Sequence, residues 1–263
     1  MTDPIATRTH VAALDPAGRA DAFTAVYQGY LRPLSMSATQ MAAHVETNDI
    51  DLERSPLWLD AEGQAVGLGL VGSRAHRAWI GGFGVVPAWR GRGFALPLVE
   101  ACLAGARAAG AVEIELEVLT GNDKAIRSYA RAGFRETGRL AGFKGMIPPA
   151  DTWARPADPA ALLTCPLRPT CWQREATSLA RMPALEAVAL DDGAFVLFTR
   201  AEDAIVIRHL AAQRGDEIAR LLAATGGQTA TLVNEPADSP VSAGLSALGF
   251  EPFVSQHQMR MAL

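Results

Sequence analysis

Lysine is nearly absent from this sequence. Only Lys124 and Lys144 occur among its 24 basic residues, so arginine is the usual cation here and a lone arginine says little about function. Acidic residues number 28 and the net charge is −4. Proteins that bind nucleic-acid phosphates usually carry a clustered positive charge. We therefore expect no nucleic-acid partner.

Cysteine is also scarce. Cys102, Cys165 and Cys171 form no CxxC pair and are odd in number, which argues against a disulfide framework and against a zinc site. No stretch reaches the roughly 18 apolar residues of a membrane span. The first residues, MTDPIATRTHVAALDP, lack the basic start and apolar core of an export signal. These absences predict a cytoplasmic protein with no metal and no membrane partner.

The composition that remains is that of a folded protein with a large core. Hydrophobic residues make up 49% of the chain and charged residues 20%. The length of 263 residues is long for one ordinary domain and sufficient for two.

Local patterns in the first half alternate between helix and strand. A helix capped by Asp15 and a second one starting with a capping box at Ser37 come first. Three strands should follow, up to Pro87, and then a helix over 94–109. The alternation in AVEIELEVL predicts another strand, followed by a helix that ends at Gly133 and a last strand near 139–144. The fold class is α/β, with a mixed sheet.

Six prolines between Met146 and Cys171 predict an irregular connection. We expect a first domain over 1–145, a linker over 146–174 and a second domain over 175–263. The second domain repeats the order of hairpin, strand, helix, strand and helix, but in shortened form. The interval from Gly63 to Asn122 is 59 residues, whereas the interval from Gly193 to Asn234 is 41.

The 18 residues missing from the second copy fall where the first copy carries a glycine-rich turn with two arginines, within VVPAWRGRGFALPLVEAC, residues 85–102. A glycine-rich turn between a strand and a helix directs several backbone N–H groups to one point, where the helix dipole adds positive charge. Such a turn suits a phosphate, although it can also be simply a tight turn. The chain has no GxxxxGK[ST] motif and no GxGxxG with a following acidic strand residue. Nucleoside-triphosphate and dinucleotide sites are therefore not expected.

The turn resembles the acyl-CoA signature of the GNAT superfamily of acetyl-CoA-dependent N-acetyltransferases. That signature, [Q/R]-x-x-G-x-[G/A], is matched by Arg90, Gly93 and Ala95. A second family pattern is matched in LEVLTGNDKAIRSYARAGF by Asn122, Ala125, Tyr129, Gly133 and Phe134. The resemblance covers residues 10–145 directly and 175–263 in outline. It implies tandem GNAT-like domains, the N-terminal one complete and the C-terminal one shortened.

The resemblance implies acetyl-CoA as cosubstrate and a site between two parallel strands that separate. The pantetheine arm would enter between residues 83–86 and 116–119, and the N–H groups of 91–95 would take the pyrophosphate. The cofactor-binding residues implied are Phe83, Gly84, Val85, Val86, Arg90, Gly91, Arg92, Gly93, Phe94, Ala95, Asn122 and Tyr129.

Two residues are candidates for catalysis. Tyr129 matches the family's usual general acid, which protonates the departing thiolate; its other interpretation is a core aromatic. Glu117 lies twelve residues before it, a spacing that resembles the ribosomal-protein N-terminal acetyltransferases, in which a strand glutamate serves as base. Glu117 can equally belong to the solvent face of its strand, with a water chain as base. The family's other common position for a basic carboxylate holds Gly81 and Gly82.

Several residues allow two interpretations. We expect surface or turn roles for His44 and His76, which have no partners at ligand spacing. Six further residues lie where this family shapes its acceptor pocket, but a solvated loop or the core explains them equally well: Tyr27, Tyr30, Asp49, Asp51, Glu53 and Trp58.

The second copy lacks a turn that corresponds to the glycine-rich turn of the first copy. It also has Leu245 where Tyr129 stands in the first. We expect it to be catalytically silent and to brace the first copy. For the whole chain we predict acetyl transfer to a primary amine, on either a small molecule or a peptide N-terminus. The alternative is a non-catalytic acyl-CoA-binding module. The chain is expected to be a monomer or a homodimer.

Overall fold

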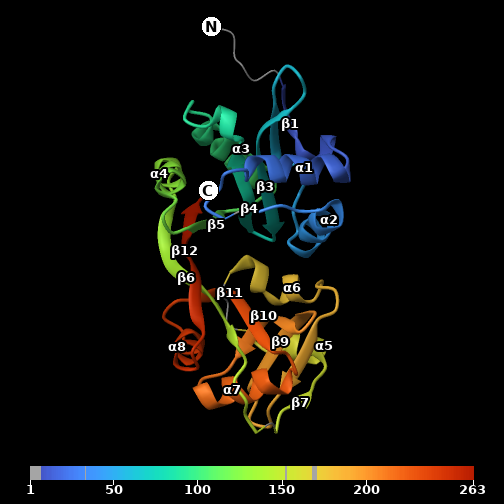
Figure 1. Ribbon diagram of the computed structural model, residues 1–263. Coiled ribbons are helices and arrows are strands. Elements are labelled where there is room, and N and C mark those ends of the chain that lie inside the picture. The colour runs from blue at the N-terminus through green and yellow to red at the C-terminus, as the bar shows by residue number, and fades with distance from the viewer. Residues whose placement is uncertain (1–6, 33, 152, 168–170) are drawn as a thin grey trace. The chain divides into compact units, whose positions relative to one another are not determined.

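The computed structural model describes residues 7–32, 34–151, 153–167 and 171–263. The chain forms two compact units (Figure 1). The first comprises Met1–Thr137 together with Gln258–Leu263, and the second comprises Gly138–His257. The C-terminal end thus belongs to the first unit, which the sequence analysis did not anticipate. The segment expected to be a linker, 146–174, lies inside the second unit.

The described part of the first unit is a mixed sheet with four α-helices and two 3-10 helices, η1 (Val11–Ala13) and η2 (Pro87–Trp89). Its strands are β1 (Thr7–His10), β2 (Pro56–Leu59), β3 (Ala65–Arg74), β4 (Arg77–Val85) and β5 (Glu113–Leu119). They lie in sequence order, and the C-terminal end of β12 (Glu251–Ala262) lies next to β5. Its helices are α1 (Pro16–Val26), α2 (Ala38–Thr47), α3 (Ala95–Ala108) and α4 (Asp123–Ala132). The strand β1 was not predicted.

Both N-terminal helices begin where their caps predict. The Gly18 N–H donates to Asp15 Oδ1 at 2.7 Å, and α1 starts at the next residue, Pro16. At α2, the Gln40 N–H donates to Ser37 Oγ at 3.2 Å and the Ser37 N–H donates to Gln40 Oε1 at 2.9 Å. This reciprocal pair is the predicted capping box, which is confirmed.

The second unit is also a mixed sheet with helices. Its strand order is β12, β6 (Arg135–Met146), β11 (Thr229–Pro236), β10 (Ala204–Ala211), β9 (Phe195–Ala201), β8 (Glu186–Ala189) and β7 (Arg155–Pro156). Its helices are α5 (Pro159–Leu163), the 3-10 helix η3 (Trp172–Arg174), α6 (Ala176–Leu179), α7 (Gly215–Ala224) and α8 (Pro240–Ala247). The proline-rich segment was expected to be irregular, but it contains short regular elements. Pro159 is compatible with α5 because it occupies the first turn of that helix, where a missing N–H costs little.

The two units share an unusual strand arrangement. In the first unit, β4 and β5 pair in parallel only as far as Ile80 opposite Leu116, and Gly81 is an extra, bulged residue in β4. In the second unit, β10 and β11 pair in parallel only as far as Ile207 opposite Leu232, and Arg208 is the bulged residue. We call the unpaired ends the β4–β5 fork (residues 81–85 and 117–119) and the β10–β11 fork (residues 208–211 and 233–236). The matching forks identify the second unit as a copy of the first.

Candidate acyl-CoA site

The β4–β5 fork is followed by the glycine turn, residues 90–94, which leads into α3. Gly91 has φ +75° and Gly93 has φ +87°, backbone conformations that favour glycine. Within the described ranges, the N–H groups from Gly91 to Leu96 donate to no protein acceptor. The turn therefore presents a run of open N–H groups at the positive end of α3, the arrangement that binds phosphate.

The two arginines of the glycine turn have different roles. Arg90 Nε donates to Val85 O at 2.9 Å, and its Nη2 donates to Val26 O at 2.9 Å and Gln28 O at 2.7 Å. This guanidinium therefore ties the end of α1 to β4. Arg92 is exposed, with its guanidinium carbon 5.2 Å from the centre of the Trp89 ring. Arg92 is the cation of this turn that can reach an anion.

The backbone of β4 offers fewer groups to the β4–β5 fork than predicted. Val86 N–H donates to Val66 O of β3 at 2.9 Å. Backbone groups alternate along a strand, so those of Gly84 face β3 as well, and those of Phe83 and Val85 face the fork. The contacts agree, because Phe83 N–H donates to the Tyr27 hydroxyl at 3.3 Å. The Phe83 N–H is thus engaged by Tyr27, and the Val85 carbonyl by Arg90, so the Phe83 carbonyl and the Val85 N–H are the remaining backbone groups of these two residues that face the fork. The pantetheine contacts stay a prediction.

Three tyrosines, the whole complement of the chain, gather beside the fork. Tyr129 of α4 is buried, and its ring lies 5.7 Å from Phe83 and 5.8 Å from Phe134, measured between ring centres. Tyr27 and Tyr30 meet edge to face at 5.1 Å. Asn122 accepts a hydrogen bond from Ala125 N–H at 3.3 Å and donates to the Tyr30 hydroxyl at 3.2 Å. Asn122 thus caps α4 and links it to this cluster.

Burial keeps these hydroxyls protonated. It raises the pKa of Tyr27 to about 12 and also raises the pKa of Tyr30. The pKa of Tyr129 is raised well above its usual value of 10, first by burial and then by the neighbouring Tyr27 and Tyr30. Tyr129 therefore carries its proton throughout the neutral range, and its O–H is available to a group bound beside it.

The glutamates of β5 are not a solvated row. Arg260, near the chain's C-terminus, lies 3.1 Å from Glu115 and 3.6 Å from Glu113. Glu115 is only 4% exposed. Glu117 differs from both, because its Oε2 accepts a hydrogen bond from Trp79 Nε1 at 2.8 Å. It is the first residue of β5 beyond the last β4–β5 pair, and so lies at the base of the fork.

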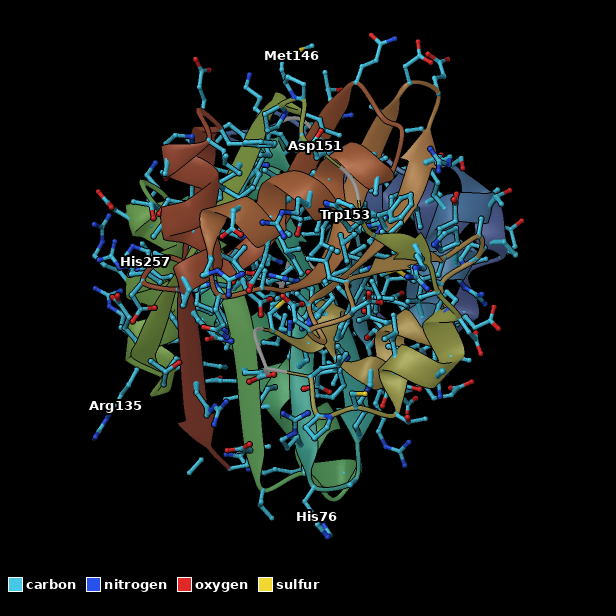
Figure 2. All side chains as sticks on the ribbon, turned by 90° about the horizontal axis from the view of Figure 1, so that it is seen from below. His76, Arg135, Met146, Asp151, Trp153 and His257 are labelled. Atoms are coloured by element: carbon cyan, nitrogen blue, oxygen red, sulfur yellow. The ribbon has the colours of Figure 1, made fainter. Side chains whose placement is uncertain are left out.

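The two histidines behave differently. His76 is exposed in the turn after β3 and points outward (Figure 2), as predicted. The expectation of a surface or turn role is wrong for His44. Its ring lies 6.5 Å from Phe23 and 6.1 Å from Trp79 between ring centres, and burial lowers its pKa. The place of His44 in the last turn of α2 does not show from the sequence that its ring is enclosed. The ring becomes enclosed only when it packs against Phe23 and Trp79.

Most of the acidic residues before β2 serve the local structure. Asp49 pairs with Arg74 of β3 at 2.6 Å, and Asp51 pairs with Arg54. Asp51 Oδ1 also accepts the N–H groups of Glu53 and Arg54 at 3.1 and 3.2 Å. These contacts favour a structural role for Asp49 and Asp51 over attraction of a cationic amine.

Trp58 lies in the core below the glycine turn. It is 4% exposed, and its ring meets that of Phe94 edge to face at 6.3 Å between ring centres. Its core interpretation is therefore favoured.

In the second unit, an arginine side chain bridges the corresponding fork. Arg174 of η3 donates from Nε to Arg208 O and from Nη1 to Asn234 O, both at 2.9 Å. These two carbonyls belong to opposite arms of the β10–β11 fork. Arg174 also pairs with Glu235 at 2.6 Å, and the two side chains are 6% and 2% exposed.

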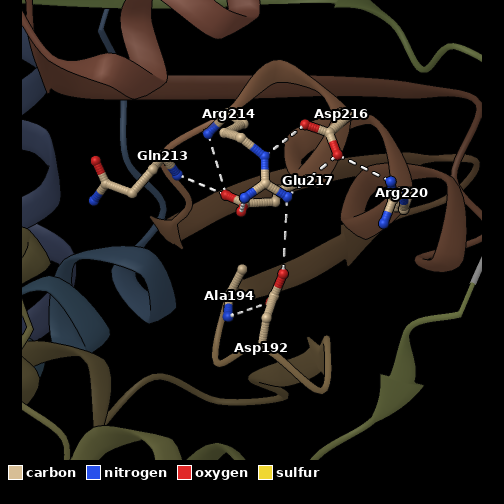
Figure 3. Close-up of polar contacts among 7 residues, drawn as sticks. All are labelled: Asp192, Ala194, Gln213, Arg214, Asp216, Glu217 and Arg220. Carbon is tan, nitrogen blue, oxygen red and sulfur yellow. Dashed lines mark hydrogen bonds and ion pairs between the residues drawn. The ribbon is translucent and has the colours of Figure 1, made fainter.

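The helix start that follows β10 is occupied as well. Glu217 Oε2 accepts the N–H groups of Gln213 at 2.8 Å and Arg214 at 3.1 Å, at the N-terminus of α7 (Figure 3). Arg214 in turn lies 2.7 Å from Glu217 Oε1. A carboxylate of the chain thus takes the position that the glycine turn leaves open in the first unit. Leu245, at the position that corresponds to Tyr129, is fully buried in α8.

Among the described residues, no cluster of three or more His, Cys, Asp or Glu side chains is arranged to hold a metal ion. Every helix in the same ranges is too short or too polar to cross a membrane.

Comparison with known proteins agrees with this geometry. Residues 23–134 match the model of the acetyltransferase (GNAT) family, a segment that contains the β4–β5 fork, the glycine turn and α4. No curated protein matches the chain.

Several solved structures share the fold over nearly the whole chain. A GCN5-related N-acetyltransferase from Sphaerobacter thermophilus has a TM-score of 0.72 at 17% identity, with 100% of this chain and 96% of that chain covered. A tandem GNAT protein from the clavulanic acid biosynthesis pathway has a TM-score of 0.69 at 15% identity, with 97% and 98% covered. A GCN5-related N-acetyltransferase from Anabaena variabilis ATCC 29413 has a TM-score of 0.61 at 16% identity, with 97% and 72% covered. At such identities these matches establish a shared fold.

Proposed function

Since this chain carries an acetyltransferase domain of the GNAT family, whose members transfer acyl groups from acetyl-CoA, we propose that it moves the acetyl group of acetyl-CoA to a primary amine. One observation carries the proposal: an open run of N–H groups at the glycine turn adjoins a strand fork that has a protonated tyrosine and a glutamate beside it. These are the groups that a thioester aminolysis requires.

The cofactor would bind mainly to backbone. The N–H groups of residues 91–96 and the Arg92 guanidinium suit the pyrophosphate, and the Phe83 carbonyl and the Val85 N–H suit the pantetheine amides. Arg90 would act indirectly, because its guanidinium is engaged with three carbonyl groups. Asn122 would act indirectly as well, by capping α4 and so fixing Tyr129.

The reaction balances with two side chains. The amine nitrogen attacks the thioester carbonyl carbon and its proton passes to Glu117, directly or through water. When the carbon–sulfur bond breaks, the Tyr129 hydroxyl gives its proton to the coenzyme A thiolate. Overall one N–C bond forms, one C–S bond breaks, and one proton moves from the amine to the sulfur. Exchange with water then removes the proton from Glu117 and restores the proton of Tyr129.

Replacing Tyr129 by phenylalanine tests the acid. The ring contacts to Phe83 and Phe134 remain, so folding and acetyl-CoA affinity should change little. We expect kcat to fall about 100-fold, the usual contribution of a positioned general acid. Steady-state kinetics with thiol release measures this. Unchanged turnover would remove Tyr129 from the mechanism and leave it as a core aromatic.

Replacing Glu117 by glutamine tests the base. If Glu117 accepts the amine proton, the rate must fall at low pH in the wild type as the carboxylate becomes protonated. We expect the variant to lose this acidic limb of the pH–rate profile and to turn over at least tenfold more slowly at neutral pH. A variant that keeps the wild-type acidic limb would rule out Glu117, and a water chain would then be the base.

The acceptor remains either a small-molecule amine or a peptide N-terminus. The Glu117 spacing favours the second, whereas no described patch of charge selects between them. The alternative function, a non-catalytic acyl-CoA-binding module, is separated by turnover of any amine in a screen read by thiol release. Column elution with light scattering distinguishes a monomer from a homodimer.

The second unit is proposed to be a silent copy that binds no acyl-CoA. The second copy has no counterpart of the glycine turn, and two of its side chains, Arg174 and Glu217, support the same proposal. Arg174 spans the β10–β11 fork and Glu217 takes the N–H groups at the start of α7. The chain thereby supplies its own cation in place of the pantetheine arm and its own anion in place of the pyrophosphate.

A further inference from the structure

Glu117 of β5 is held by a hydrogen bond from the neighbouring strand β4. Its Oε2 accepts the indole N–H of Trp79, a residue of β4 that is 1% exposed. Trp79 is adjacent to the last β4–β5 pair, Ile80 with Leu116, and Glu117 follows Leu116 directly. The hydrogen bond therefore crosses between the strands at the point where they begin to separate.

The backbone of β4 is adapted to this tryptophan. A Cβ atom at position 81 would fall 2.2 Å from Trp79 Cζ3, so only glycine fits beneath the indole ring. Gly81 is also the bulged residue of β4. The family's other common position for a basic carboxylate holds Gly81 and Gly82 here, and the Trp79 ring lies over the first of these two glycines.

A residue of α2, His44, packs against the Trp79 ring. The His44 ring lies 6.1 Å from the Trp79 ring between ring centres, and Asn48 Nδ2 lies 3.2 Å from His44 Nδ1. Burial lowers the pKa of His44, with the Gly81 backbone acting in the opposite direction. The imidazole is therefore uncharged at neutral pH and adds packing without an ion pair to Glu117.

We propose that Trp79 is a positioning residue for Glu117: its indole N–H holds the carboxylate at the base of the β4–β5 fork, and the His44 ring supports the indole from α2. This inference rests on the proposed function, because it assumes that Glu117 accepts the amine proton. Its physical basis is that a hydrogen bond to a charged group in a buried site fixes the direction of that group.

The test is Trp79→Phe, which keeps an aromatic ring over Gly81 and removes the N–H. We expect kcat to fall roughly tenfold or more, the effect of one hydrogen bond to a charged group, with acetyl-CoA affinity unchanged. The same change should have no further effect in a Glu117→Gln background, since Trp79 acts only through the carboxylate. Trp172→Phe, at a fully buried tryptophan of the second unit, is the matched control and should keep its kcat.

The hydrogen bond between Trp79 and Glu117 can also be tested without measuring turnover. The indole N–H resonance of Trp79, assigned by its loss in Trp79→Phe, should move when Glu117 becomes glutamine, and an unmoved resonance would overturn the proposal. So would an unchanged kcat in Trp79→Phe, or an equal loss in both backgrounds. If Glu117→Gln is impaired but Trp79→Phe is not, the base assignment stands alone. If Glu117→Gln matches the wild type, the base and its positioning residue fail together.

Discussion

Replacing Gly93 by aspartate should weaken acetyl-CoA binding about a hundredfold. The new carboxylate would lie among the N–H groups at the start of α3, where the pyrophosphate is proposed to bind. Two unit charges about 5 Å apart repel by about 3 kcal/mol at an effective dielectric constant of about 20, which weakens binding about a hundredfold. Titration calorimetry of acetyl-CoA into the wild type and the variant measures the loss.

Strain must be separated from charge in this experiment. Gly93 has φ +87°, so any side chain there strains the backbone even though a Cβ would meet no atom within 4 Å. Gly93→Asn introduces a side chain of the same shape without the charge, and both residues tolerate positive φ better than most. We expect Gly93→Asn to bind within about tenfold of the wild type. Equal losses in both variants would mean that backbone strain, not repulsion of an anion, explains the result.

The wild-type titration also counts sites. A stoichiometry of one acetyl-CoA per chain agrees with a single open glycine turn, whereas two per chain would contradict the proposal that Arg174 and Glu217 close the second copy. If the folded wild type binds no acetyl-CoA, the glycine turn is only a turn and the acyl-transfer proposal fails.

Replacing Arg174 by methionine should destabilise the second unit by about 3–5 kcal/mol, the cost of leaving a buried charge without its partner. Glu235 would lose its cation while its side chain stays 2% exposed. The carbonyls of Arg208 and Asn234 would lose their donor across the β10–β11 fork. Amide hydrogen exchange in β10 and β11 measures the change within the unit, where two-state unfolding of the whole chain cannot be assumed.

Two further variants identify the cause. Arg174→Lys keeps the positive charge but cannot donate to both carbonyls in the geometry of a guanidinium, so an intermediate loss is expected. Arg174→Met combined with Glu235→Gln removes both charges and should recover part of the stability, because no unpaired ion remains. If Arg174→Met exchanges its β10 and β11 amides like the wild type, the bridge contributes nothing and another feature must hold the fork.

The sequence was sufficient for features that depend on near neighbours. Asp15 and Ser37 locate the starts of α1 and α2, because a cap bonds to an N–H three residues away. The alternation of apolar and acidic residues locates β5, and the glycines at 91 and 93 locate the turn before α3, whose binding of acyl-CoA stays a prediction. In the second copy, the start of the last helix was predicted less accurately from the sequence. Asn234 was matched with Asn122, yet it lies within β11 with φ +60°, and Ser239 caps α8 instead.

The tertiary structure decided which partners the charged side chains meet. Glu113, Glu115 and Glu117 look alike in the sequence, and they differ only because Arg260 meets the first two and Trp79 meets the third. Periodicity and capping act over a few residues, so a sequence records them directly. Contacts between residues 38 or 145 positions apart arise only when strands pair and helices pack, and the sequence alone does not determine which side chains then meet.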